Sequence, residues 1–161
     1  MKNLKVQLQQ SLKDASKIVI MGIGSELIGD DAAGVLVVQK LEKQIKSKNV
    51  LVLNCCTSPE NFTGIVKDFK PTDIIIVDSA DFNEQPGFTR IIGHDEINGV
   101  SFSTHRLPTK IMIDYLIQSL ACRILVIGIQ PKHLVYGEKP SSEVLDAVSA
   151  LAKDIKESIV I

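Results

Sequence analysis

The sequence lacks three features that are typical of membrane proteins, nucleic-acid-binding proteins and disulfide-rich secreted proteins. No apolar run reaches the roughly 18–20 residues that a membrane span requires. Lysine and arginine total 18 against 19 acidic residues, a net charge of −1, and no basic stripe with interleaved aromatics is present, so we expect neither a membrane nor a nucleic acid as partner. Three cysteines cannot form an ordinary disulfide framework, and an odd number indicates a reducing compartment. We therefore expect a cytoplasmic protein.

The composition predicts one globular domain. The 161 residues are 45% hydrophobic and 23% charged, which is enough apolar material for a packed core and is unlike a disordered chain. This length fits a single core, so residues 1–161 are expected to form one domain. Residues 1–14 alternate lysines and glutamines with leucines, a pattern that predicts an amphipathic helix and not a secretion signal.

Four apolar runs rich in β-branched residues predict parallel strands buried on both faces, because their apolarity is continuous and not alternating. Segments with helical periodicity lie between and after them, and this alternation predicts a three-layer α/β/α sandwich. The Pro86-Gly87 turn precedes residues 88–93, a fifth strand expected at an edge and antiparallel. Residues 94–104 are the best candidate for a long mobile loop. The predicted strands are residues 17–23, 50–54, 73–77 and 122–129, and the helices are 31–45, 59–69, 108–120 and 142–158.

Two helix starts have characteristic residues. Ser58 followed by Pro59 and Glu60 predicts an N-cap, a proline at the first helical position and an acid in the first turn. Asp30 and Asp31 lie between the first strand and the next helical segment, where acidic side chains favour the positive helix end. Asp30 suits the capping role, which leaves Asp31 available for another function.

The glycines between Gly22 and Asp31 suggest a nucleotide-binding turn, but the details exclude one. A dinucleotide fingerprint requires a third glycine where Leu27 stands, and a phosphate-binding loop requires Gly-Lys-Ser/Thr where the chain has Gly29-Asp30-Asp31. Two carboxylates would repel a phosphate. The turn is therefore expected to face a cation or a neutral peptide.

Asp31, Asp78 and His105 are predicted to converge at the carboxyl edge of the sheet, where open α/β sheets bind their ligands. Each has an ordinary structural alternative: Asp31 as a helix-start acid, Asp78 as a solvated loop acid after the third strand, and His105 as a structural histidine before a helix that starts at Pro108. Together, two carboxylates and an imidazole form a ligand set suited to nickel, zinc, cobalt, manganese or iron.

Competing hydrolase signatures are missing from the sequence. It contains neither a Gly-x-Ser-x-Gly elbow nor a His-Glu-x-x-His helix. Cys55 and Cys56 are too close in sequence to supply the spaced thiolate pair of a structural zinc site. Either could act as a nucleophile oriented by His105, but as residues at a strand end they are expected to be packed and inert. His94 and His133 are expected to be surface or packing residues.

The run Gly22-x-Gly24-x-x-Leu27-x-x-Asp30-Asp31-x-x-Gly34, followed by Val77-Asp78, Thr104-His105 and finally Gly128-Ile129-Gln130-Pro131, resembles the maturation endopeptidases of nickel-iron hydrogenases. The resemblance covers nearly the whole chain. Asp-Asp in the first motif, with Thr104-His105-x-x-Pro108 later, is most similar to the subgroup that serves hydrogenases of the formate-hydrogenlyase type.

The resemblance implies a function and a site. Members of this family remove a carboxyl-terminal extension from the hydrogenase large-subunit precursor after nickel has been inserted, so the metal arrives with the substrate and the free enzyme is expected to be metal-free. Motif by motif, the nickel-contacting and catalytic residues are Asp31, Asp78 and His105. A monomeric, aspartic-type endopeptidase is implied. Whether the metal polarises the amide or a carboxylate activates water is left open.

One departure and two rival functions accompany the resemblance. The family often has Gly-Gly where this chain has Cys55-Cys56, and glycines there would allow a substrate backbone to approach closely. The cysteines could instead contact the metal transiently. A non-cleaving chaperone for the nickel-loaded precursor would use the same three residues, and a metal amidase acting on small substrates is a third reading.

Overall fold

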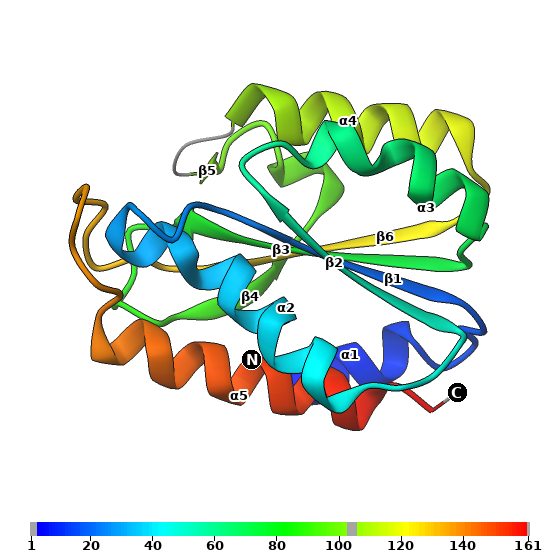
Figure 1. The fold of residues 1–161 in the computed structure, drawn as a ribbon, viewed down its shortest axis with the longest axis horizontal. Coiled ribbons are helices and arrows are strands. Elements are labelled where there is room, and N and C mark those ends of the chain that lie inside the picture. The colour runs from blue at the N-terminus through cyan, green and yellow to red at the C-terminus, as the bar shows by residue number, and fades with distance from the viewer. Residues whose placement is uncertain (1–2, 103–105, 161) are drawn as a thin grey trace.

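Six strands form one sheet with α-helices on both faces, as Figure 1 shows for this computed structural model, which describes residues 3–102 and 106–160. The strands are β1 (Ile18–Ile23), β2 (Val50–Cys56), β3 (Asp73–Asp81), β4 (Thr89–Ile92), β5 (Ser101–Phe102) and β6 (Arg123–Ile129). The α-helices are α1 (Leu4–Ser11), α2 (Ala33–Gln44), α3 (Thr63–Phe69), α4 (Arg106–Ser119) and α5 (Ser142–Ser158). None of the described helices is both long and apolar enough to cross a membrane.

The strand order places a topological switch point between β1 and β3. The order is β2-β1-β3-β6-β4, with parallel pairing except that β4 runs antiparallel to β6, and β5 pairs antiparallel with the end of β3. From β1 the chain first crosses to β2 and then returns past β1 to β3. In open α/β sheets the crevice at such a reversal, at the carboxyl ends of the strands, is the usual ligand site.

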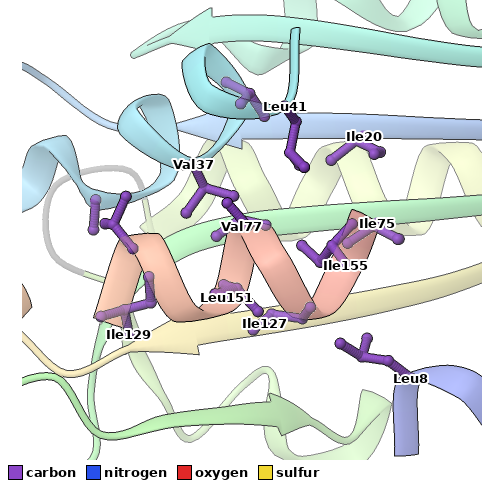
Figure 2. Packing of buried hydrophobic residues seen from close by; sticks show 14 of the residues in the cluster. Leu8, Ile20, Val37, Leu41, Ile75, Val77, Ile127, Ile129, Leu151 and Ile155 are labelled. Carbon is purple, nitrogen blue, oxygen red and sulfur yellow. The ribbon is translucent and has the colours of Figure 1, made fainter. Parts of the chain in front are cut away.

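Successive side chains along each strand point to opposite faces of the sheet, so the hydrophobic core consists of two clusters, one on each face. Ile18 and Ile20 of β1 pack with α1, α2 and α5, whereas Val19 and Met21 pack with α3 and α4. Figure 2 shows the first of these clusters, in which Val37 and Leu151 from two helices meet the strand residues. Because both faces are covered, the central strands contain continuous apolar stretches, such as Ile74 to Val77 in β3, which explains the continuous runs in the sequence.

The predicted α/β/α sandwich and its antiparallel edge strand are confirmed, with corrections to the boundaries. The sheet has six strands and not five, because β5 and a short 3-10 helix (His94–Glu96) lie in the predicted loop 94–104. The strand β3 continues to Asp81 because β6 pairs with it beyond the predicted end at residue 77. The helix α4 starts at Arg106 and not at Pro108, since a proline in the first turn removes no helical hydrogen bond.

The start of the third helical segment is also more complex than predicted. Pro59 does occupy the first helical turn, but the turn is a 3-10 helix, Pro59–Phe62, and α3 follows it. Ser58 occupies the cap position without a side-chain hydrogen bond to the turn. The predicted N-cap position of Ser58, the proline in the first turn and the acid Glu60 are therefore confirmed.

Helix α2 begins in direct contact with the backbone of two strands. A Cβ atom at Gly34 would lie 2.2 Å from the Val77 carbonyl oxygen and 2.4 Å from that of Ile23. Only hydrogen fits there, so glycine is required for the first turn of α2 to reach the ends of β1 and β3.

Gly34→Ala is expected to lower the free energy of unfolding by about 1–3 kcal/mol, because backbone must move to admit the methyl group. The matched control is Gly64→Ala in α3, where an added Cβ meets nothing within 4 Å. This control should be neutral or more stable by up to about 1 kcal/mol. Urea denaturation of both variants measures the difference. Equal midpoints for Gly34→Ala and wild type would refute the close approach.

Candidate functional site

Two of the three predicted site residues lie at the switch point. Asp31 is in the 3-10 helix Gly29–Ala32, between β1 and α2, and Asp78 is in β3. Both residues are 0% exposed. Since β1 and β3 are neighbouring parallel strands, the turn that leaves one strand and the last part of the other share the carboxyl edge of the sheet.

Asp31 is held by the turn that follows β1. Its Oδ2 accepts a hydrogen bond from the Ser25 N–H at 2.8 Å. Gly24 precedes that turn with φ of 144°, and a Cβ there would lie 1.8 Å from the Asp31 carbonyl oxygen. Gly24 therefore permits the chain to fold back over Asp31, and this explains the glycine better than any phosphate contact would.

Asp78 is a buried carboxylate with one oxygen unsatisfied. Its Oδ1 accepts the Ser79 N–H at 2.7 Å, whereas Oδ2 has no hydrogen-bond partner among the described residues. Burial raises the pKa of the Asp78 carboxyl well above its usual range, the negative charge of Asp31 raises it further, and the Ser79 N–H opposes both. The alternative of a solvated loop acid is therefore wrong, because β3 extends past Asp78 and encloses it.

His105 lies outside the described residues, so its convergence with the two carboxylates stays a prediction. The residues on either side are placed: Phe102 of β5 pairs with Ala80 of β3, and α4 starts at Arg106. Ala80 is two residues beyond Asp78 on the same strand. The chain therefore reaches the neighbourhood of Asp78 immediately before the segment that contains His105.

Asp30 has a different function from the one predicted. It does not cap a helix: the side-chain cap of α2 is missing, and its N-cap position is Ala32. The buried Asp30 carboxylate accepts four hydrogen bonds from the loop after β6: Lys132 N–H at 2.7 Å, His133 N–H at 3.2 Å, Ser141 N–H at 2.6 Å and Ser141 Oγ at 2.9 Å. Sequence reasoning missed this role, because the partners are more than 100 residues away along the chain.

The two adjacent cysteines differ in environment. Cys55 is buried, and burial raises the pKa of its thiol to about 12, so it is protonated at neutral pH and is a poor nucleophile. Cys56 is exposed with φ of 46°, so the prediction of a packed residue holds for Cys55 and is wrong for Cys56. Cys56 accepts the Gly24 N–H on its carbonyl at 2.8 Å, which places it at the edge of the candidate site.

The remaining histidines stay outside the predicted site. His94 has an exposed side chain near Asp95 and Asp114. His133 packs against Gly29, where a Cβ would lie 2.7 Å from the ring Nδ1, and this buried Nδ1 has no hydrogen-bond partner within the described part of the chain. These positions agree with the surface and packing roles that the sequence predicts.

Asp31 and Asp78 supply two buried carboxylates at the carboxyl edge of the sheet. A buried carboxylate oxygen without a hydrogen-bond donor is the kind of acceptor that a divalent cation can satisfy, and oxygen donors with one imidazole suit nickel and its neighbours. Among residues 3–102 and 106–160, no three side chains of ligand type are grouped closely enough to bind a metal. The described part of the chain thus supplies two carboxylates, an incomplete ligand set that a metal carried by another molecule can complete.

Asp78→Asn is expected to stabilise the metal-free protein at pH 7.5, on the order of 1–3 kcal/mol, because burial penalises the charged form of the carboxyl and a neutral amide has no such form. The Asp78 pKa is higher in the folded chain than in the unfolded chain, where it is about 3.9. Wild-type stability therefore falls as pH rises above about 4, and the gain from Asp78→Asn should vanish near pH 4.

Urea denaturation in the presence of a chelator, at several pH values, measures this gain. Asp81→Asn is the control on the same strand, because the Asn83 N–H and then the Gln130 side chain lower the pKa of the exposed Asp81 carboxyl. This control should not stabilise the protein at any pH. A gain for Asp78→Asn that does not depend on pH would contradict the buried charge.

The sequence profile of the hydrogenase maturation protease family HycI matches residues 35–158. A protein of Methanocaldococcus jannaschii that is provisionally named a hydrogenase maturation protease is 46% identical to this chain over 136 residues, which cover 80% of each chain. The hydrogenase 3 maturation protease of Escherichia coli is 31% identical over 134 residues, 83% of this chain and 85% of that one.

Solved structures agree with these relatives. The crystal structure of the hydrogenase maturation protease HycI from Thermococcus kodakarensis superposes with a TM-score of 0.86 at 35% identity, over 94% of this chain and 97% of that one. The solution structure of the endopeptidase HycI from E. coli gives 0.79 at 29% identity, over 88% and 90%. The chain therefore belongs to the HycI family of hydrogenase maturation proteases, which are peptide hydrolases.

Proposed function

We propose that this protein removes a carboxyl-terminal extension from the nickel-loaded precursor of a hydrogenase large subunit, and that Asp31, Asp78 and His105 contact the nickel that the substrate carries. The observation behind this proposal is the unsatisfied Oδ2 of the buried Asp78 beside the charge of Asp31. Family membership supplies the reaction class, peptide-bond hydrolysis. The unpaired cysteines support a reducing compartment, and we place the reaction in the cytoplasm.

The two described carboxylates have separate tasks in this proposal. Asp31 is oriented by the Ser25 N–H and contributes a carboxylate to the site. Asp78 is fixed by the Ser79 N–H on one oxygen, which leaves the other oxygen for the substrate. When bound, the nickel supplies Lewis-acid polarisation and a point of attachment. By binding the substrate here, the chain holds the scissile bond at the sheet edge, and such positioning can contribute roughly 7–11 kcal/mol in favourable systems.

Proton transfer is the second task of this edge. A carboxyl whose pKa is raised holds a proton more readily than an exposed one, a property that suits general acid-base catalysis. Burial raises the pKa of the Asp78 carboxyl, so we propose that its Oδ2, when it is not in contact with the nickel, accepts a proton from the attacking water and returns it to the leaving amine. The reaction would then be of the aspartic type. Cys55 takes no part in it, because its thiol is buried and protonated.

Asp31→Asn, Asp78→Asn and His105→Ala are each expected to slow precursor processing by about 100-fold or more, on the scale of losing an acid-base or charge-stabilising group. Mass spectrometry of the precursor over time measures loss of the extension. His94→Ala is the control for the histidine variant, because His94 has an exposed side chain outside the predicted site, and it should process at nearly the wild-type rate. Normal rates for all three site variants would refute the assignment.

Nickel-free precursor should retain its extension in the presence of this protein, and the nickel-loaded form should lose it. The reason is that the two described carboxylates do not complete a ligand set, so binding depends on metal that the substrate brings. The E. coli relative is named for hydrogenase 3, so a precursor of that kind is the first to test. If the loaded precursor binds and stays uncut, the protein is the non-cleaving chaperone. Stoichiometric zinc in the purified protein would favour the small-substrate amidase.

A further inference from the structure

Two loops at the carboxyl edge of the sheet present large apolar side chains to solvent. Leu27, in the loop after β1, is 61% exposed, and Tyr136, in the loop after β6, is 76% exposed. Leu134 and Val135 precede Tyr136 and are 39% and 51% exposed. These four side chains are called the apolar rim below. Grouped exposed apolar side chains commonly mark a surface that another molecule covers.

Backbone hydrogen bonds hold the two loops of the apolar rim against each other. The Gly137 N–H donates to the Leu27 carbonyl oxygen at 2.8 Å, and the Gly29 N–H donates to that of Glu138 at 3.2 Å. Ile28 and Tyr136 form an antiparallel bridge. In Figure 1 the loops lie side by side at the left end of the sheet. The rim is therefore one surface and not two independent loop tips.

The apolar rim is also fixed relative to the candidate site. Asp30, the neighbour of Asp31 in sequence, receives four hydrogen bonds from Lys132, His133 and Ser141, which bracket the rim segment of the second loop. The Asp30 N–H donates in turn to the His133 carbonyl oxygen at 3.1 Å. This buried carboxylate therefore connects the rim to the turn that carries Asp31.

A pocket of about 330 Å³ lies between the apolar rim and β3. Leu134 lines it together with Gln130 and Asp81, the last residue of the strand that contains Asp78. Rim, pocket and strand end therefore form a continuous surface at one edge of the sheet. A protein substrate whose scissile bond reaches Asp78 has to cover this edge, so its adjacent surface is the molecule that the rim faces.

We propose that the apolar rim binds an apolar surface of the large-subunit precursor next to the cleavage point and thereby selects folded precursor over other nickel-bearing molecules. This inference rests on the proposed function of the site. Aromatic side chains that become fully covered tend to dominate protein interfaces, and Tyr136 is the most exposed member of the rim. Tyr136 is therefore expected to contribute most to binding.

The test compares Leu27→Ser/Tyr136→Ser with Val6→Ser/Val160→Ser, a control that removes exposed apolar side chains from α1 and the chain end (41% and 89% exposed). Binding to immobilised nickel-loaded precursor gives Kd, and initial cleavage rates give KM and kcat. The rim variant should raise Kd and KM about 10-fold or more and leave kcat within about twofold, as expected for contacts made equally before and during the reaction. The control should match wild type in all three.

Each outcome bears on one proposal. Unchanged Kd and KM in the rim variant overturn the inference. The inference is also overturned if the wild-type protein sediments as a dimer and the rim variant sediments as a monomer with unchanged KM, because the rim would then bind a second copy of the chain. Precursor that binds wild type but is never cut refutes the proposed function, whereas a loss of this binding in the rim variant still supports the rim. Thermal unfolding verifies that the double variant folds, and Tyr136→Ser alone, which should give a smaller rise in KM, is the second variant.

Discussion

The close approach of α2 to β1 and β3 determines where the functional groups of this molecule lie. At Gly34 the helix backbone is so near the Val77 and Ile23 carbonyl oxygens that no Cβ fits. Because the helix starts there, the turn before it, with Asp31, lies at the end of β1 beside the strand that contains Asp78. Two carboxylates are thus buried near each other by packing alone. Their mutual repulsion is a cost that the close contact imposes on the fold.

Two buried aspartates at this edge, Asp30 and Asp78, differ in how their oxygens are satisfied. Asp30 receives three backbone N–H groups and one hydroxyl, so its negative charge is stabilised within the protein and it acts as a connector. Asp78 keeps one oxygen without a donor among the described residues, and its pKa is raised. A residue that destabilises the fold at neutral pH is retained at functional sites when a ligand satisfies it. Satisfaction of the oxygens, and not residue type, therefore separates structural from candidate functional aspartates.

The sequence predicted the elements better than the contacts between them. Apolar runs and helical periods gave four of the strands and all five helices to within a few residues, because burial on both faces makes a continuous pattern. The strand β5 was not predicted, because a strand of two residues is too short to show an alternating or continuous apolar pattern. The predicted role of Asp30 was wrong, because its hydrogen-bond partners, Lys132 and Ser141, are distant along the chain. Asp31 and Asp78 were selected as candidates because of their predicted place at strand ends; the structure buries both of them, and His105 lies outside the described residues.

The connector role of Asp30 links recognition of metal with recognition of protein. Nickel alone would be a poor criterion, because many small molecules bind it. A rigid attachment between Asp31 and the loop that carries Leu134 to Tyr136 changes this, since a molecule that places nickel at Asp31 also meets the apolar rim at a fixed offset. Only a substrate with its metal and its apolar surface at the matching separation satisfies both. Under the two proposals, specificity would arise from the geometry that the buried Asp30 carboxylate maintains through its four hydrogen bonds.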